Sequence, residues 1–523
     1  MARTDPLLIP GDTCWRMDRA DRVSFLVDGA DHFLAVKKAM AQARRSIWLL
    51  SWVFDPLTRF SPDPFERSSD PTDPDRLGLM LRRLAVLNPA LDVRILTWDM
   101  PPPIAASQAF APQRGALYFK DSPVKYRLDR TLPWSACHHQ KVLVIDGRLA
   151  FVSGGDLGAD RWDTCDHLDG DGRRRLPTGK RYPARHDVAM MMEGPVAQAC
   201  AELFAARWER SGGGPVDLPE PAEEPIWPEG FAADLMGVDV ALARTEPKWK
   251  DQDGAQEGQR LHLASIAAAR HTIFIENQYL TAPVIVEALC RRLEEEDGPE
   301  VIAIGPSRSP SFFDRMTMDS ARIAAINRLE QSDFYDRFRA FSARTARDEP
   351  IIVHSKVTII DDRLIRIGSA NLNNRSGGLD TECDAAIEAD EGLEGVETRA
   401  TIAAFRTLLI GHYFGRGLVE TAEAIRETGS VAAAIDALDG HPRRLMPQDR
   451  RPLGALERFI AGWSLGDPLA PSDAWRPWVR RDHVREALDC LPRPLAGRPS
   501  DPPPAEGDPT PSGSTGRKAT QPW

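Results

Sequence analysis

Two stretches of the chain have closely similar sequences, and this internal duplication limits the possible folds more than any other feature. HQKVLVIDGRLAFVSGGDL begins at His139, and HSKVTIIDDRLIRIGSANL begins 215 positions later at His354. A second pair, ARRSIW from Ala43 and ARHTIF from Ala269, matches at an offset of 226. Because similar sequences fold alike, the chain is expected to contain two similar halves in tandem.

Each half contains a helix pattern that leads directly into a buried strand. DHFLAVKKAMAQARRSIWLLSW from Asp31 and LHLASIAAARHTIFIENQYL from Leu261 have apolar residues at helical spacing, followed by a continuous apolar stretch. VRILTW from Val93 and VIAIG from Val301 are typical of further strands that helices cover. We therefore predict an α/β protein with two pseudo-symmetric lobes, each a mixed sheet flanked by helices, and an active site at the lobe interface.

Composition shifts along the chain suggest where the lobes begin and end. SGGGPVDLPEPAEEPIWPEG, residues 211–230, has the Gly, Pro and Glu content of a linker. It would separate an N-terminal lobe, residues 1–210, from a C-terminal lobe, residues 231–430, which a helical extension follows at 431–490. Residues 491–523 contain too few apolar side chains to offset the entropy lost on ordering and are expected to be disordered.

Charge and hydrophobicity narrow the class of protein. The net charge of −11 disfavours binding to nucleic acid by bulk electrostatic attraction. No apolar run approaches the roughly 18 residues that a membrane span needs, and the first residues, MARTDPLLIP, do not form an export signal. The seven cysteines include no CxxC pair and fit reduced thiols. The expected protein is a cytoplasmic monomer that contacts membranes only peripherally; secretion without a signal would leave no mark in the sequence.

Each half carries one copy of the pattern His-x-Lys-x4-Asp within a predicted hairpin. The residues are His139, Lys141 and Asp146 in the first copy, and His354, Lys356 and Asp361 in the second. Residues two apart on a strand project to the same side, so each histidine and its lysine can reach one ligand together. Histidine serves as a nucleophile or proton carrier near neutral pH, and lysine neutralises a phosphate oxygen. The pattern therefore predicts a site that handles phosphate.

The aspartate of each pattern has two possible functions. Asp146 and Asp361 belong to the motif and are counted with the candidate catalytic residues, but both fall at the expected hairpin turn. Aspartate is favoured at turns because its carboxylate bonds nearby backbone, so a structural role is the better interpretation. The sequence contains neither HExxH nor a group of carboxylates suited to two metals, and no metal or other cofactor is expected.

The duplicated motif resembles the phospholipase D superfamily, of which it is the defining feature. Further segments extend the resemblance over most of residues 20–430 and are similar to the lipid-acting branch: GGDLGADRWD from Gly154, RHDVAMMMEGP from Arg185, IENQY from Ile275, GSANLNNRS from Gly368 and LDTECDAAIE from Leu379. One position departs from the usual pattern, because the asparagine expected after the first motif is Asp156. A carboxylate would repel a phosphate, so Asp156 is expected to face elsewhere.

The resemblance implies roles for the motif residues. His139 would be the nucleophile that forms a phosphohistidine, and His354 the acid that protonates the leaving group and then activates water; the reverse assignment stays open. Lys141, Lys356 and Asn371 would bind the phosphate oxygens. Because the two imidazoles would begin in different protonation states, their surroundings should separate their pKa values.

The resemblance also implies that a carboxylate from the opposite half orients each histidine. Glu382 would pair with His139, and Asp187 with His354, although ordinary surface ion pairing is the alternative for both carboxylates. His138 and His186, which lie beside two of these residues, are expected to be packing residues.

The resulting prediction is a phospholipase D. It would hydrolyse the distal phosphodiester of a phosphatidylcholine-type phospholipid at a membrane surface, giving phosphatidate and the free alcohol, and another alcohol could replace water in transphosphatidylation. The alternatives are a cardiolipin-synthase-like phosphatidyltransferase and a nuclease of the same superfamily, the latter disfavoured by the acidic balance. A catalytically inactive binding protein is disfavoured because both motifs are intact.

Overall fold

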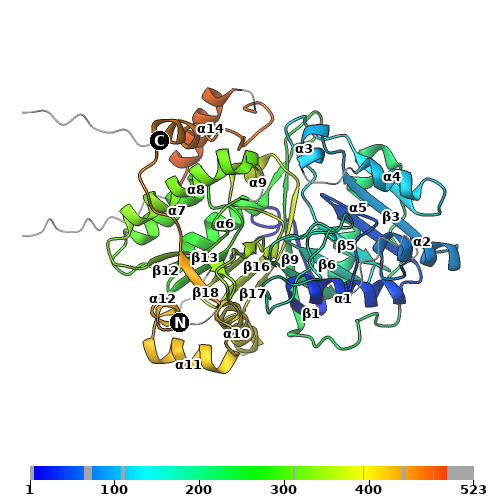
Figure 1. Cartoon of the computed structure of the whole chain (residues 1–523), viewed down its shortest axis with the longest axis horizontal. Helices are drawn as coiled ribbons and strands as arrows, with labels where there is room; N and C mark the ends of the chain where they lie inside the picture. The colour runs from blue at the N-terminus through cyan, green and yellow to red at the C-terminus, as the bar shows by residue number, and fades with distance from the viewer. Residues whose placement is uncertain are drawn as a thin grey trace, which may run out of the picture.

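The two halves of the chain lie side by side and have similar arrangements of strands and helices (Figure 1). The computed structural model describes residues 5–63, 73–107, 112–309, 312–392, 394–438, 443–474 and 476–491. The tail expected to be disordered, 491–523, lies outside the described residues except for Leu491. The mixed α/β class and the two pseudo-symmetric halves are confirmed, but the halves share one sheet instead of having one each.

One mixed sheet of sixteen strands extends through both halves. Its first-half strands are β1 (Arg16–Val27), β2 (Ser46–Ser51), β3 (Asp92–Trp98), β4 (Lys125–Asp129), β5 (Val142–Ile145), β6 (Leu149–Ser153) and β8 (Val188–Glu193). Its second-half strands are β9 (Leu235–Glu246), β10 (Ala255–Gln256), β11 (Thr272–Glu276), β12 (Glu300–Ile304), β13 (Phe338–Arg344), β15 (Val357–Ile360), β16 (Leu364–Gly368), β17 (Glu382–Glu388) and β18 (Arg444–Pro447).

The order of the strands is the same on both sides of a central pair. β1 and β9 run antiparallel at the centre, with Arg16 opposite Leu242 and Val23 opposite Leu235. From β1 outward the order is β8, β6, β5, β2, β3, β4, and from β9 outward it is β17, β16, β15, β11, β12, β13. The two hairpins that carry the motifs therefore occupy equivalent places on either side of the β1–β9 pair.

Helices cover both faces of the sheet. The long helices are α1 (Asp28–Gln42), α2 (Leu77–Leu87), α5 (Pro195–Trp208), α6 (Glu257–Ala268), α7 (Pro283–Leu293), α8 (Phe312–Ser332) and α10 (Glu394–Phe414). On one face, α5 and α10 pack against strands of both halves in a single apolar core. On the other face, α1 and α2 cover the first half, and α6, α7 and α8 cover the second.

Smaller elements complete the chain. They are α3 (Pro102–Ser107), α4 (Gln113–Phe119), η1 (Glu209–Gly213), α9 (Asn374–Gly378), α11 (Leu418–Thr428), α12 (Val431–Ala437), α13 (Ala455–Gly462) and α14 (Pro477–Asp489). The extension 431–490 is not purely helical as expected, because its strand β18 pairs with β13 and extends the sheet. The expected linker begins in η1 and continues without regular elements to 230. The proposed domain boundaries stay a prediction.

Both motif hairpins have the same tight turn. Asp146 and Gly147 have positive φ values of 50° and 58°, and the Arg148 amide donates to the Ile145 carbonyl at 3.0 Å. This is the type I′ geometry that suits the twist of two antiparallel strands. Asp361 and Asp362 repeat it at φ 50° and 54°, so two non-glycine residues adopt the left-handed conformation in the second half.

The motif aspartates hold each hairpin to the strand next to it. Asp146 accepts hydrogen bonds from the backbone amides of Arg44, Arg45 and Ser46, each at 2.8 Å. Asp361 accepts three in the same way, from Arg270, His271 and Thr272, at 2.5 to 2.8 Å. The segments that match at an offset of 215 contain these aspartates, and the segments that match at an offset of 226 contain the amides that they bond. The two sequence matches thus correspond to one contact that occurs in both halves.

Replacing Asp146 with alanine should destabilise the fold, because three backbone amides lose a charged acceptor. We expect Asp146→Ala to lower the free energy of unfolding by about 3 kcal/mol, and Asp361→Ala to have a similar effect. Urea denaturation followed by circular dichroism measures this. Asp121→Ala, at an exposed turn residue, is the control and should change stability by less than about 0.5 kcal/mol. An equally small change in Asp146→Ala would contradict this role.

Candidate active site

Two short parallel pairings connect the halves where the motifs begin. β7 (Arg185–His186) pairs with β14 (Ile352–Val353), with His186 opposite Val353. The residues that follow these strands are Asp187 and His354. In the same way, an isolated bridge pairs His138 with Thr381, and the residues that follow these two are His139 and Glu382. In both places, the local pairing sets a histidine of one half beside a carboxylate of the other.

The two histidines bond these carboxylates through Nδ1. His139 Nδ1 lies 2.8 Å from Glu382 Oε2, and His354 Nδ1 lies 2.8 Å from Asp187 Oδ2. Each bond leaves Nε2 of the imidazole free to face a substrate. The structure thus brings together all four residues that the resemblance paired, and the carboxylates are buried instead of forming surface ion pairs. Their catalytic roles stay a prediction.

Glu382 is fixed by two hydroxyl groups as well as by the imidazole. Ser369 Oγ and Ser376 Oγ each donate to it at 2.6 Å. Burial raises the pKa of Glu382 to about 8, although Lys141 and both hydroxyls act in the opposite direction. At neutral pH the His139–Glu382 pair can therefore hold a proton easily. This suits a group that must be protonated at one stage of a reaction and neutral at another.

Asp187 has different surroundings. Its Oδ1 accepts from the Val188 amide at 2.9 Å, and burial raises the pKa of the carboxyl to about 6 against the charges of Lys356 and Arg185. The His354 Nδ1 that bonds Asp187 also lies 3.1 Å from Lys356 Nζ. The second histidine therefore has a cation close to its ring, and the two half-sites are not equivalent.

Both motif lysines point back to their own histidines. Lys141 Nζ donates to the His139 carbonyl at 2.7 Å, and Lys356 Nζ donates to the His354 carbonyl at 2.5 Å. Both side chains are buried. Burial lowers the pKa of Lys356 to about 7, despite the nearby Asp187 carboxylate. Such an ammonium group lacks sufficient neighbouring negative charge, and a phosphate would supply it.

Asp156 does not face away from the site, so that expectation was wrong. Its Oδ1 accepts from the Ser51 hydroxyl and the Trp52 amide, both at 2.7 Å, and its Oδ2 lies 3.7 Å from Lys141 Nζ. Burial opposes its charge, but Lys141, Arg161 and the Ser51 hydroxyl outweigh burial and keep the pKa of Asp156 below its ordinary value. The Asp156 carboxylate neutralises Lys141, and the hydrogen bonds from Ser51 and Trp52 hold the carboxylate in place.

Asn371 occupies the position in the second half that corresponds to Asp156. It is buried in the loop after β16, and its Oδ1 has no hydrogen-bond partner among the described residues. The second half therefore carries a neutral amide at the position where the first half carries a carboxylate.

The pKa values of both motif histidines are lowered in the free site. Burial and the charges of Lys141 and Lys356 lower the pKa of His139 well below its ordinary value. Burial and the charges of Lys356 and Arg185 do the same for His354. The expected separation of the two pKa values stays a prediction. A bound anion would oppose these charges and make protonation of one imidazole easier.

Asp146 and Asp361 do not reach the site, and their inclusion among the catalytic residues was wrong. Asp146 bonds Ser46 at the start of β2, whereas Ser51, at the other end of that strand, contacts Asp156. The length of the strand between these points is about 16 Å. The alternative interpretation as turn residues agrees with the structure.

Sequence reasoning missed several residues around the histidines. The Trp52 ring stands edge-on to His139, with ring centroids 6.3 Å apart. Gly154 lies so close to Asp187 that a Cβ would be 2.3 Å from Oδ1 and 3.3 Å from Lys356 Cδ. The glycine allows the first half to touch the second, and the GG in the first motif was the available signal for it.

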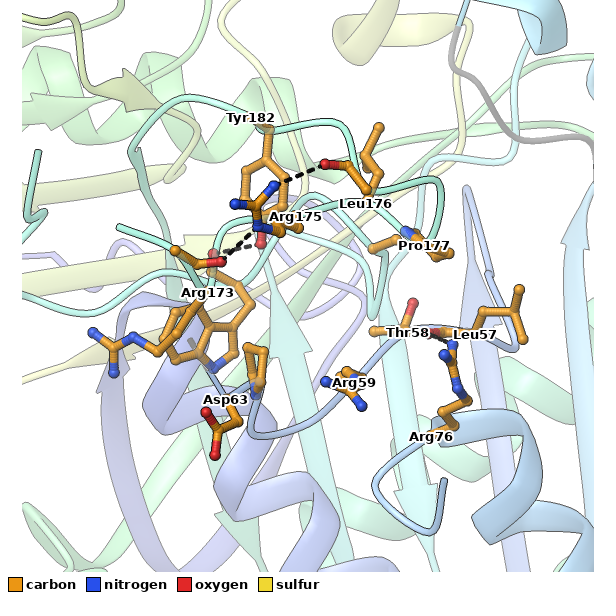
Figure 2. Close-up of a pocket in the computed structure, with 15 residues that line it drawn as sticks. Leu57, Thr58, Arg59, Asp63, Arg76, Arg173, Arg175, Leu176, Pro177 and Tyr182 are labelled. Atoms are coloured by element: carbon orange, nitrogen blue, oxygen red, sulfur yellow. Dashed lines mark hydrogen bonds between the residues drawn. The ribbon is translucent and has the colours of Figure 1, made fainter. Parts of the chain in front are cut away.

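A separate cavity of about 410 Å³ is lined by arginines, and Figure 2 shows it between residues 57–63 and 172–182. Arg175 donates to the carbonyls of Gly172 and Gly179, each at 3.1 Å, which shapes one wall. None of the four motif histidines and lysines lines this cavity. A smaller adjoining cavity, of about 120 Å³, is lined by Val53 and Arg161, which neighbour Asp156.

Comparison with known proteins shows which families this chain is similar to. A family model described as cardiolipin synthase, PLD-like domain, matches residues 263–400. Phospholipase D A of Dictyostelium discoideum is 27% identical over 459 residues, covering 73% of this chain and 34% of that protein. Cardiolipin synthase A of Pseudomonas entomophila is 25% identical, covering 69% of this chain and 64% of that protein. The chain spans between about a third and two thirds of the length of these relatives.

A solved structure agrees in fold. Phosphatidylserine synthase of Haemophilus influenzae Rd KW20 superposes with a TM-score of 0.50 at 14% sequence identity, covering 80% of this chain and 95% of that one. Within the described part of the chain, no helix has the length and apolar character to cross a membrane. The duplicated motif and these relatives make the chain similar to the phospholipase D superfamily, and the solved structure agrees with it in fold.

Proposed function

We propose that the protein is a phospholipase D that cleaves the distal phosphodiester of a glycerophospholipid through a phosphohistidine. The observation that carries the proposal is the pair of motif histidines, each bonded through Nδ1 to a carboxylate of the opposite half. Two such imidazoles beside two lysines provide a nucleophile, a proton donor and charge compensation without any further group.

In the first step, Nε2 of His139 attacks phosphorus and forms a P–N bond. The bond from phosphorus to the headgroup oxygen breaks, and His354 gives its proton to that oxygen. His139 suits the nucleophile because Glu382 and two serine hydroxyls orient it and its side chain is the more exposed, at 15% against 7% for His354. His354 takes up its proton when the anionic substrate offsets the charge of Lys356.

In the second step, the histidines exchange tasks. His354, now neutral, accepts a proton from water, the water oxygen bonds phosphorus, and the P–N bond to His139 breaks. Phosphatidate leaves and both imidazoles return to their starting states. An alcohol in place of water would give a new phospholipid, so transphosphatidylation follows from the same intermediate.

The substrate class rests on the relatives. The curated relatives include phospholipases D and cardiolipin synthases, both named for reactions of phospholipids. A phosphatidyltransferase is the second candidate, since the matching family model is described as cardiolipin synthase. The same chemistry could serve a nuclease, but the net charge of −11 disfavours it. We propose that the enzyme acts at a membrane surface without spanning it.

Assays on defined substrates distinguish these functions. Incubation with phosphatidylcholine vesicles should release choline, and added ethanol should yield phosphatidylethanol, because both acceptors react with one intermediate. Phosphatidylglycerol vesicles and single-stranded DNA serve as the competing substrates. Production of cardiolipin without choline release would favour the transferase, and cut DNA with intact lipid would contradict a lipid-acting enzyme.

Removing either histidine should abolish turnover. We expect His139→Ala and His354→Ala each to lower kcat at least about a thousandfold, and Lys141→Ala at least about a hundredfold, because the nucleophile, the proton donor or charge compensation is lost. Choline release measures this, and His271→Ala, at an exposed histidine, is the matched control. A His354→Ala variant that kept most of its activity would show that the two half-sites work separately.

Anion binding should weaken as the pH rises through about 7. Lys356, whose pKa is about 7, is charged below this pH and neutral above it, so the affinity contributed by its charge is present at low pH and lost at high pH. Between pH 6.5 and 8.5, calorimetry should find about a tenfold weaker affinity for sulfate, whose own charge is constant. Lys356→Arg keeps its charge and should lose this dependence. An unchanged slope in Lys356→Arg would assign the titration to another group.

A further inference from the structure

Behind the active site, three buried side chains from distant parts of the sequence converge on one space. Asp28 begins α1, His167 lies in the segment between β6 and β7, and His412 lies in the last turn of α10. The first two belong to one half and His412 to the other, and Figure 1 shows α10 beside β1 where the halves meet. All three residues are at least 92% buried.

The spacing of their donor atoms fits a small cation. His167 Nε2 and His412 Nε2 are 2.9 Å apart, and Asp28 Oδ2 is 3.7 Å from the first and 3.6 Å from the second. Two ligands of a tetrahedral zinc ion, each about 2.1 Å from the metal, are about 3.4 Å apart. The three measured distances bracket this value without any rearrangement of the side chains.

Hydrogen bonds fix which atoms can donate a lone pair. His167 Nδ1 bonds Asp163 Oδ2 at 2.9 Å, so the carboxylate holds a proton on Nδ1 and leaves Nε2 unprotonated. A histidine held this way by a carboxylate is the usual arrangement behind a metal-binding imidazole. In the metal-free site His412 Nε2 donates a hydrogen bond to His167 Nε2 at 2.9 Å, and a metal that binds both nitrogens would displace this proton.

A fourth histidine in the cluster cannot be a ligand. His186 Nδ1 lies 2.8 Å from Asp28 Oδ1, and His186 Nε2 lies 3.0 Å from Glu276 Oε2. Carboxylates only accept hydrogen bonds, so both ring nitrogens of His186 carry protons. The ring connects Asp28 to Glu276 and fixes the Asp28 carboxylate with Oδ2 turned to the other two histidines.

The environment of Asp28 Oδ2 indicates that a cation binds here. This buried oxygen has no hydrogen-bond partner among the described residues, whereas Asp28 Oδ1 has both His186 and the Asp187 amide. A buried carboxylate oxygen without a donor is costly, and a cation would satisfy it.

We propose that Asp28, His167 and His412 bind one divalent transition metal ion, of which zinc matches the ligands best. Two imidazole nitrogens and one carboxylate oxygen are typical zinc ligands, and water would complete the coordination. The ion is structural and takes no part in phosphate chemistry. It joins the start of α1 to α10 across the halves and fixes Asp28, whose Oδ1 accepts the Asp187 amide at 3.2 Å.

Metal analysis of the full chain, prepared without a histidine tag, tests the proposal. After chelation and dialysis, the protein should bind about one equivalent of zinc, and X-ray absorption at the zinc edge should show nitrogen and oxygen neighbours only. Asp28→Asn and His412→Ala should bind zinc at least about a hundredfold more weakly. His271→Ala replaces an exposed histidine outside the cluster and should bind zinc normally.

Three results would overturn the proposal. The first is wild-type protein that is folded by circular dichroism yet binds less than a tenth of an equivalent at micromolar zinc. The second is unchanged zinc affinity in a folded His412→Ala or Asp28→Asn variant. The third is sulfur in the zinc absorption spectrum, which would place the ion at an exposed thiol such as Cys165 or Cys490. If neither variant folds, the wild-type stoichiometry and spectrum decide the question.

Discussion

The antiparallel pairing of β1 with β9 determines which side chains of the two halves can meet. Without it, each half would be a separate sheet whose motif hairpin had no defined partner. With it, the hairpins lie at equivalent distances from one axis, and the chain ahead of each histidine pairs with the chain ahead of a carboxylate from the other half. Every bond that orients an imidazole follows from this one pairing of strands.

The site is built at an electrostatic cost that a substrate can offset. Two lysines, three carboxylates and the His354 imidazole are withdrawn from water, which is unfavourable unless each charge finds a partner. Lys141 has Asp156 at 3.7 Å. The second half has Asn371 at the position of Asp156, and Asp187, which bonds His354, is the carboxylate whose charge acts most on Lys356. The second half-site is therefore short of negative charge, and a phosphodiester carries the charge that it lacks.

The repeated sequence was sufficient to predict the mixed α/β class, the two similar halves and the motif residues, but not the single sheet that the halves share. The helix and strand patterns of both halves were correct, because long apolar stretches of regular period form the same elements in most contexts. Glu382 and Asp187 could be paired with their histidines only through the resemblance, since local patterns do not indicate partners in another half. The contribution of β18 to the sheet was missed because its four residues carry little pattern.

Other features depend on distances that no sequence pattern contains. Asp156 was expected to avoid the site because a carboxylate repels phosphate, but Lys141 and the Ser51 hydroxyl make its position favourable. Burial and the two nearby lysines lower the pKa values of both histidines, which no sequence pattern indicates. Asp28, His167 and His412 come from three separate segments with no motif spacing, so only the fold reveals their convergence.

The exchange of carboxylates between halves has an evolutionary consequence. A chain with only one half would hold a histidine whose carboxylate was missing, and it would become complete only by associating with a second copy of itself. Fusion of two such copies would make that association permanent and free the copies from identity. The two halves differ at equivalent positions, with aspartate at 156 and asparagine at 371. An assembly of identical subunits could not differ in this way, because it must carry the same residue at both places.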